Sequence, residues 1–507
     1  MKRGISLFIS ILFILAFNKT NAQGLNSNWL IGSLVPSLDS NTTSKLCRIN
    51  FFNGTPFISP DARKMKFRRT QANISDANGS LLMSSNGFWI ADASGDTMQN
   101  GSGLAFHSNF TVDIPYGYPF IASNLMLPFP GDTSKYVLFH QMGATWLPDS
   151  MQCFYSIIDM SLNNGLGAVI SKNNLLSTMV NVSAGIGACK HGNGRDWWVF
   201  VTQDNSNLVY KILLTPTGIS SISSQTFSIP ITFYSTGTQP AFSPDGLHYA
   251  ISNSGGNFKI NYINIFDFDR CTGNLSNLKS IFIRDSLECT SLTFSPNSKY
   301  LYFDNDSFIY QLNVDSLAFN INYKKVATYD GYTISGISPT NFYQMYRAID
   351  GKIYVVSRNA VTYLNYINYP DSADTLCDVR QHSFQLPSYN FGTVPNHPNY
   401  YLGPVENSGC DTLSGIKNSY LNQEQILKVV PNPSINGAFG ISYVLGQNQK
   451  GLLQVFDING KKVHEQSLPQ WSTFQQINVP NLANGIYSLR LQSGNGVRRA
   501  KVVVLQE

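Results

Sequence analysis

Charge is scarce in this sequence, and so are long apolar runs once the N-terminus is passed. Only 13% of the 507 residues are charged, and the formal net charge falls from +5 to +2 when Lys2, Arg3 and Lys19 leave with an N-terminal leader. A nearly neutral chain lacks the electrostatic footprint for nucleic acid or anionic lipid. No later run reaches the ~20 apolar residues of a membrane span. The composition predicts no nucleic-acid partner and no transmembrane segment.

Cysteine is also scarce, and its seven positions show no CxxC spacing, so a structural zinc site is not predicted. Disulfides are possible if the chain is exported. The arguable pairs, which the sequence leaves open, are Cys153–Cys189, Cys271–Cys289 and Cys377–Cys410, with Cys47 left over.

Motifs of common catalytic and metal sites are missing as well. The histidines are scattered without HxH or HExxH spacing, and neither GxSxG nor GxxxxGK[ST] occurs. The sequence therefore predicts no catalytic residue, cofactor or metal ligand.

The first 22 residues have the pattern of a secretory signal peptide. A basic pair, Lys2-Arg3, precedes the apolar run 5–17, and small residues follow. We expect cleavage between Ala22 and Gln23, which makes the mature chain an exported one that passes through the periplasm.

The peptide "KHGNGRDWW" (190–198) holds a candidate site. His191, Arg195 and Asp196 beside two tryptophans would suit a sugar-binding site. The favoured interpretation is a hairpin turn, with Trp197 and Trp198 pointing to opposite faces of the next strand.

Two further clusters have a functional and a structural interpretation. Asp267 and Asp269, at period two, could serve calcium or acid–base chemistry, but a role in the corner before a turn is favoured. The basic cluster 63–69 is interpreted as a solvated loop or strand edge.

A short turn repeats along an otherwise alternating, aromatic-rich chain. "AFSPDGLHYAIS" (241–252) is echoed by "TFSPNSKYLYFD" (293–304) and "RAIDGKIYVVS" (347–357). The first turn residues are Asn78, Thr133, Asn193, Asp245, Asn297 and Asp350. Subtraction gives spacings of 55, 60, 52, 52 and 53 residues. A period near fifty in an all-β chain indicates β-propeller blades.

The repeat count favours seven blades over six, because residues 24–60 and 375–405 remain to build or close another blade. Pairing of N- and C-terminal strands would close the ring and remove its open edges.

Several blade segments resemble exported WD-like propeller proteins of Bacteroidetes, and the resemblance implies a seven-bladed domain with no catalytic assignment. The segments are "NWLIG" (28–32), "ISDANGSLLMSSNGFWIADASGDTMQNG" (74–101), "YSIIDMSLNNGLGAV" (155–169), "KHGNGRDWWVFV" (190–201), "FSPDG" (242–246), "NIFDFDRCTGNLSN" (264–277) and "DGKIYVV" (350–356).

The pattern changes after residue 404. Residues 405–425 are polar and are predicted to be a linker, and alternation returns over 426–507 in six or seven short strands. A small immunoglobulin-like sandwich of two sheets is expected there.

This last unit is similar to the type A C-terminal sorting domain of the type IX secretion system. The matching residues are Pro431, Asn432, Pro433, Gly437, Asp457, Gly460, Lys461, Gly485, Tyr487 and Lys501. The resemblance implies recognition by the outer-membrane secretion machinery, often followed by cleavage, which would fall in 405–425. The two prolines cannot donate ladder hydrogen bonds and are expected at a sheet edge.

Six Asp-Ser/Thr-apolar triplets resemble the O-glycosylation motif of exported Bacteroidetes proteins, and modification of one or two is expected. They begin at Asp96, Asp149, Asp285, Asp315, Asp374 and Asp411.

Together these features predict an all-β chain with a signal peptide (1–22), a propeller (23–404), a linker (405–425) and a sorting domain (426–507). It is expected at the cell surface or in the medium as a protein- or glycan-binding module. A propeller hydrolase or lactonase acting on polysaccharide, and a structural cell-envelope or gliding-associated protein, are the alternatives.

Overall fold

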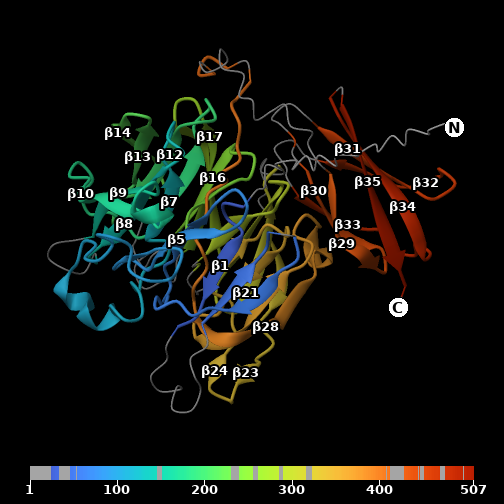
Figure 1. Ribbon diagram of the computed structural model, residues 1–507, viewed down its shortest axis with the longest axis horizontal. Helices are drawn as coiled ribbons and strands as arrows, with labels where there is room; N and C mark the ends of the chain where they lie inside the picture. The colour runs from blue at the N-terminus through green and yellow to red at the C-terminus, as the bar shows by residue number, and fades with distance from the viewer. Residues whose placement is uncertain are drawn as a thin grey trace, which may run out of the picture.

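The computed structural model describes residues 24–33, 46–52, 54–144, 151–229, 239–254, 261–284, 289, 291–315, 323–406, 408–411, 427–443, 445, 450–468, 474–494 and 496–506. The predicted signal peptide lies outside these residues. Most of the chain forms a seven-bladed β-propeller, and its C-terminal part forms a separate β-sheet unit (Figure 1).

Each blade is a small antiparallel sheet formed by consecutive strands. Blade 1 contains β1 (Asn28–Ile31), β2 (Cys47–Asn50) and β3 (Phe57–Pro60); blade 2 contains β4 (Ala72–Ser75), β5 (Leu81–Ser85) and β6 (Ile90–Ala91). Blade 3 contains β7 (Asn124–Pro128), β8 (Lys135–Met142), β9 (Gln152–Asp159) and β10 (Ala168–Leu175). Blade 4 contains β11 (Gly187–Lys190), β12 (Trp197–Thr202), β13 (Leu208–Thr215) and β14 (Gly218–Thr226).

The remaining blades follow the same order. Blade 5 contains β15 (Ala241–Phe242), β16 (His248–Ser254), β17 (Asn261–Asp269) and β18 (Asn274–Ile283); blade 6 contains β19 (Leu292–Phe294), β20 (Tyr300–Asp304), β21 (Phe308–Asn313) and β22 (Lys324–Thr328). Blade 7 contains β25 (Met345–Arg347), β26 (Ile353–Val355), β27 (Ala360–Ile367) and β28 (Val379–Phe391). A hairpin, β23 (Thr333–Ile334) and β24 (Ser338–Pro339), lies between blades 6 and 7, and the 3-10 helices are η1 (Ser108–Asp113), η2 (Asn163–Gly165) and η3 (Asp374–Cys377).

The repeated turn connects the first two strands of blades 2 to 7. In each, a side-chain Oδ1 accepts the N–H of the residue two positions on, at 2.9–3.1 Å. The accepting residues are Asp76, Asp132, Asn193, Asp245, Asn297 and Asp350. This bond adds to the backbone bonds of the turn, such as that from the Gly246 N–H to the Ser243 carbonyl at 2.9 Å, which is why Asp or Asn recurs there. A residue with positive φ follows, such as Gly246 at 73° or Ser298 at 62°.

The ring does not close as the sequence predicted. Every described blade sheet contains only strands that are consecutive in the chain, so no C-terminal strand pairs into blade 1. The first and last blades meet through a shared core instead, where Trp29 and Ile49 pack with Tyr354 and Leu386. Apolar burial between sheet faces holds the ring closed here, together with the Ser33 N–H, which donates to the Tyr389 carbonyl of β28 at 3.0 Å.

The C-terminal unit is one seven-stranded sheet, ordered β32-β31-β34-β35-β29-β30-β33, that folds around its own core in a nearly closed, sandwich-like form. Its strands are β29 (Lys428–Ile435), β30 (Ala438–Ser442), β31 (Gly451–Phe456), β32 (Lys462–Leu468), β33 (Phe474–Asn478), β34 (Gly485–Ser493) and β35 (Gly496–Leu505). Alternate side chains of β31 and β34 point into this core. The all-β prediction and the small sandwich are confirmed.

The prolines of this unit are not at an edge, contrary to expectation. Pro431 and Pro433 lie in β29, which is between β35 and β30. They fall where pairing with β30 is interrupted, between Val430 and Ile435. Asn432 fills the gap, because its side chain donates to the Lys501 carbonyl at 2.9 Å and accepts from the Val503 N–H at 2.8 Å. A side chain thus supplies ladder bonds that the prolines lack.

The sorting-domain sheet rests on two propeller turns. The Phe474 ring covers Gly351, where an added Cβ would lie 2.5 Å away. The neighbouring Gln475 donates from Nε2 to Asp371 Oδ2 at 3.1 Å, and the Asn297 N–H donates to the other oxygen of this carboxylate at 2.9 Å. Burial raises the pKa of Asp371 to about 6. The contact is local and polar at its centre.

Candidate functional site

The propeller axis is crossed by the chain's own residues 392–404. The amide nitrogen of Asn396 donates to the carbonyls of Ala122, Asn124 and Ile186 at 3.4, 3.0 and 2.9 Å. These carbonyls lie at the first strands of blades 3 and 4. One buried side chain therefore joins two blades to the axis segment.

Other residues of the segment contact further blades. His397 Nε2 lies 2.9 Å from the Asn73 carbonyl of blade 2, and Asn399 Nδ2 donates to the Pro244 carbonyl of blade 5 at 2.8 Å. Because its partner is a carbonyl, Nε2 must carry the proton. Burial lowers the pKa of His397 to about 4, so the ring stays neutral.

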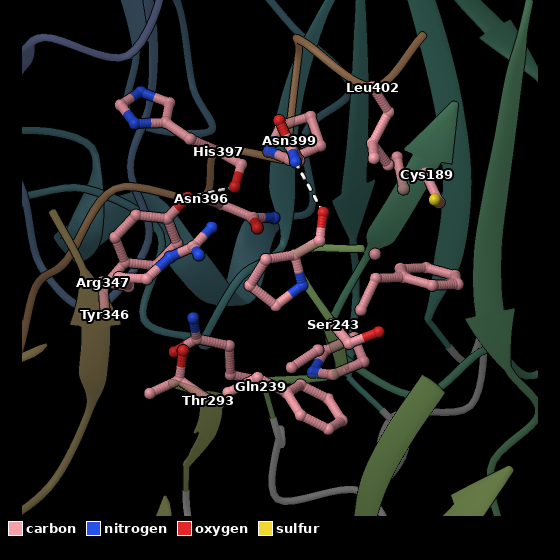
Figure 2. A pocket seen from close by; sticks show the side chains of 18 residues that line it. Cys189, Gln239, Ser243, Thr293, Tyr346, Arg347, Asn396, His397, Asn399 and Leu402 are labelled. Atoms are coloured by element: carbon pink, nitrogen blue, oxygen red, sulfur yellow. Dashed lines mark hydrogen bonds between the residues drawn. The ribbon is translucent and has the colours of Figure 1, made fainter. Parts of the chain in front are cut away.

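A pocket of about 60 Å³ remains beside the segment, against the first strands of blades 4 to 7. Its polar lining includes Gln239, Thr293, Arg347 and Asn399 (Figure 2). A space of this size accommodates a few water-sized groups. It suits one small polar ligand or the tip of a larger one.

Arg347 is the charged side chain of this pocket. Figure 2 shows it extending from β25 into the pocket, and burial lowers its pKa against the opposing effects of Tyr346, Asp371 and Asp245. Within the described part of the chain, no hydrogen bond or ion pair holds its guanidinium. Nothing in the sequence marked this residue, because its surroundings come from blades far apart in the chain.

The "KHGNGRDWW" segment forms the blade-4 turn. His191 Nδ1 accepts the Asn193 N–H at 3.0 Å, and Arg195 pairs with Asp196 at 2.7 Å. Trp197 and Trp198 are 0% and 5% exposed and belong to different core clusters. Neither ring offers a face to a sugar, which agrees with the favoured interpretation.

The two aspartates of 266–274 hold local structure. Asp269 accepts the Cys271 N–H at 2.8 Å and the Thr272 hydroxyl at 2.7 Å. Asp267 accepts from the Asn277 amide at 2.7 Å and lies 3.3 Å from His248. Among the described residues, no group of three or more His, Cys, Asp or Glu side chains could hold a metal ion.

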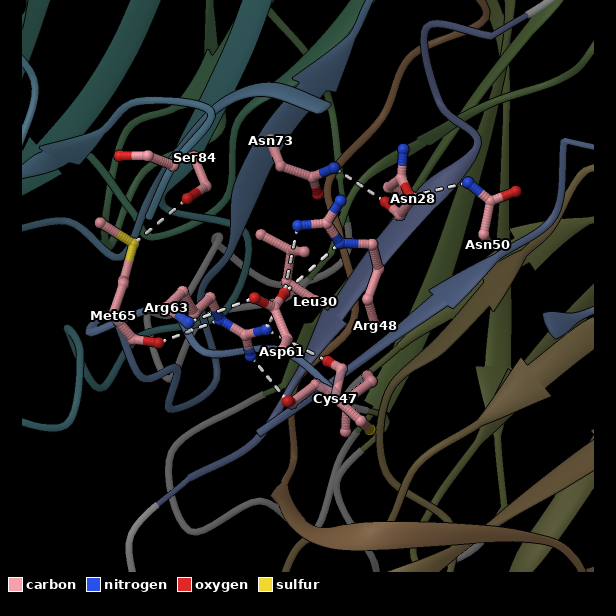
Figure 3. A network of polar contacts seen from close by, with 12 residues as sticks. Asn28, Leu30, Cys47, Arg48, Asn50, Asp61, Arg63, Met65, Asn73 and Ser84 are labelled. Atoms are coloured by element: carbon pink, nitrogen blue, oxygen red, sulfur yellow. Dashed lines mark hydrogen bonds and ion pairs between the residues drawn. The ribbon is translucent and has the colours of Figure 1, made fainter. Parts of the chain in front are cut away.

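The basic cluster 63–69 lies mostly in a loop, as predicted, but it is only partly solvated. Arg63 is 6% exposed and donates to the carbonyls of Ile31, Cys47 and Met65 and to Asp61 (Figure 3). Burial favours a higher pKa for Asp61, but the two guanidinium groups of Arg63 and Arg48 hold it below its usual value. The network connects the strands of blade 1.

The same cluster continues with ring contacts. Arg68 pairs with Asp113 at 2.5 Å and lies over the ring of Phe391, while Arg69 lies over the ring of Tyr343. Lys64 alone fits the solvated interpretation, since it is exposed and paired with Asp96 at 2.5 Å. Arg68 and Arg69 are thus held by rings that lie far away in the sequence.

The cysteines pair differently from all three arguable pairs. One disulfide joins Cys271, in the β17–β18 turn, to Cys410. Cys47, Cys153, Cys189, Cys289 and Cys377 are buried and take no part in this disulfide. The bond fastens the start of the predicted linker to blade 5, and the Val405 N–H donates to the Gly192 carbonyl at 2.6 Å nearby.

The sorting-motif residues shape the fold of their domain. Gly437 adopts φ 74° in the β29–β30 turn, and Asp457 Oδ1 accepts the N–H groups of Asn459 and Lys461 across a turn that contains Gly460. The Tyr487 hydroxyl donates to the Ala483 carbonyl at 2.9 Å. These contacts lie within the domain.

Fold and tail together define an exported β-propeller protein. Residues 428–505 match the secretion system C-terminal sorting domain family, and this tail indicates export by the type IX secretion system to the cell surface or medium. No helix among the described residues is long and apolar enough to cross a membrane. No curated protein matches the chain.

Solved structures share the propeller only distantly. A Lactobacillus plantarum protein is 11% identical, with 72% of this chain and 98% of that chain covered and a TM-score of 0.41. The Pseudomonas aeruginosa periplasmic gluconolactonase is 11% identical, with 89% and 99% covered and a TM-score of 0.35. A Desulfotomaculum acetoxidans protein of unknown function is 15% identical, with 75% and 98% covered and a TM-score of 0.37. Likenesses at this level carry no argument about activity.

Proposed function

We propose that the propeller is a binding module that recognises an extracellular glycan or protein after export. The observation that carries the proposal is the axis segment 392–404, which joins inner strands of several blades. A segment that joins several blades in this way makes the propeller a rigid scaffold. Recognition residues concentrate in the loops that such a scaffold holds in place.

The test applies the mature full chain to a glycan array and, separately, to lactones and extracellular polysaccharides with product analysis. Binding of one glycan class without product release supports the proposal. If no glycan on the array is bound, cross-linking to purified envelope proteins tests whether the ligand is a protein. Catalytic release of sugar or hydroxy-acid products, abolished by heat denaturation, would contradict a pure binding role and favour the hydrolase or lactonase.

We also propose how the chain is processed. The signal peptide is removed between Ala22 and Gln23, and the sorting domain is removed by a cut between residues 411 and 426, beyond the Cys410 disulfide. A cut on that side leaves the new C-terminus fastened to blade 5. Intact-mass measurement of the secreted protein, before and after reduction, locates both ends; a mass that retains residues 427–507 would contradict removal of the domain.

A further inference from the structure

The axial pocket holds a partly buried positive charge, and no described residue is a close partner of it. Arg347 lines the pocket, and no hydrogen bond or ion pair from the described residues reaches its guanidinium. A desolvated charge in this condition is costly, and buried charges are ordinarily paired. The pocket therefore contains donors that a ligand would satisfy.

The two carboxylates whose charges act on Arg347 already accept hydrogen bonds from other groups. Asp371 accepts from the Asn297 N–H and from Gln475, and Asp245 accepts from the Ser243 hydroxyl at 2.5 Å and the Leu247 N–H at 3.0 Å. Their charges moderate the electrostatic cost of Arg347 from a distance. They leave its N–H groups to face the pocket.

The side-chain amide of Gln239 is a second polar group in this pocket. Gln239 is 5% exposed, and its buried Oε1 has no hydrogen-bond partner. Figure 2 shows its amide on the same side of the pocket as the Arg347 guanidinium. The guanidinium requires a two-oxygen acceptor, while the amide oxygen requires a donor.

We propose that the axial pocket binds a small organic acid that carries a hydroxyl group, with the carboxylate on Arg347 and the hydroxyl hydrogen-bonded to the side-chain amide of Gln239. The volume of about 60 Å³ limits the bound part to a few heavy atoms, of glycolate size. This inference deepens the proposed binding function by naming the chemistry of one site. The acid is either free or the terminal group of a larger ligand.

The test measures Tm of the mature full chain at pH 7 in sodium glycolate, sodium acetate and sodium chloride at equal ionic strength. Glycolate at about 100-fold excess over its Kd is expected to raise Tm by about 3 °C, acetate by less, and chloride not at all. Arg347→Gln is expected to weaken glycolate binding by calorimetry at least about tenfold. Arg284→Gln, at an exposed position, is the matched control and retains the shift.

The unliganded Tm separates this site from a structural role. If Arg347 is held ready for a ligand, Arg347→Gln removes a partly buried, unpaired charge, so Tm without ligand stays equal or rises. A lower Tm in every buffer would assign Arg347 to stability and overturn the proposal. Equal glycolate shifts in wild type and Arg347→Gln, or none in either, would overturn it as well. The proposed binding function would still hold in that case if the Arg347→Gln variant binds a glycan or a protein as the wild type does.

Discussion

At the scale of single residues, blade turns were predictable and charged clusters were not. An Asp or Asn side chain that caps its own turn acts within four residues, so its signature survives in the sequence. Arg63 is held by the carbonyls of Ile31, Cys47 and Met65 and by Asp61, whereas the pocket around Arg347 is built by several blades. The residue type indicates solvent exposure for both, and only the folded chain shows that Arg63 is satisfied while no described residue forms a hydrogen bond or ion pair with the Arg347 guanidinium.

Protonation of His397 is expected to loosen the axis. Its pKa is about 4 in the folded chain against 6.5 unfolded, so the unfolded state binds the proton first and stability falls as pH drops from 6.5 toward 4. Between pH 7 and pH 5, wild type should lose about 2 kcal/mol more than His397→Gln, whose amide can still donate to the Asn73 carbonyl. Urea unfolding at both pH values measures this, with the partly exposed His464→Gln as control; parallel losses in all three chains would contradict it.

Asn396 offers a test of the axis contacts themselves. Asn396→Ala removes a donor shared by three buried carbonyls and should destabilise the propeller by about 2–3 kcal/mol. The exposed Asn478→Ala should change stability by less than about 0.5 kcal/mol. Urea titration compares the two. Equal midpoints would mean that the axis segment is not an integral part of the fold.

At the scale of elements, the sequence predicted the repeating strands but not what fills the ring. Strand period and turn spacing recur along the chain, which makes blades countable. Residues 392–404 have no repeat and no alternation, and their role follows from lying where the first strands of the blades converge. The interruption of strand β29 could not be predicted from the sequence either, because Asn432 compensates for the prolines only through contact with β35.

The disulfide is expected to act as a tether between elements. It closes a loop across a sequence separation of 139 residues, so Cys410→Ser should lower stability by about 2–4 kcal/mol and expose residues 404–411 to protease. Because both changes remove the same bond, Cys271→Ser and the double variant should match it within about 0.5 kcal/mol. Limited proteolysis with and without reductant measures whether the disulfide protects residues 404–411 from cleavage. Unchanged cleavage after reduction would show that the segment is held by other contacts.

At the scale of the whole molecule, two units with separate cores meet at a small contact. The sorting domain packs its own apolar residues, while Phe474 and Gln475 touch the propeller at Gly351 and Asp371. A contact of this kind joins the units without merging their cores, so each is expected to fold without the other. The sequence predicts this separation because the propeller repeat ends before the sorting motif begins.

Deletion of residues 426–507 tests the central claim that a C-terminal domain exports an independently folded propeller. In the native host, the full chain is expected at the cell surface or in the medium. The truncated chain should stay in the periplasm with its Cys271–Cys410 disulfide formed and its propeller protease-resistant. Fractionation with immunoblotting makes the measurement. Export of the truncated chain at the level of the full one would contradict the account.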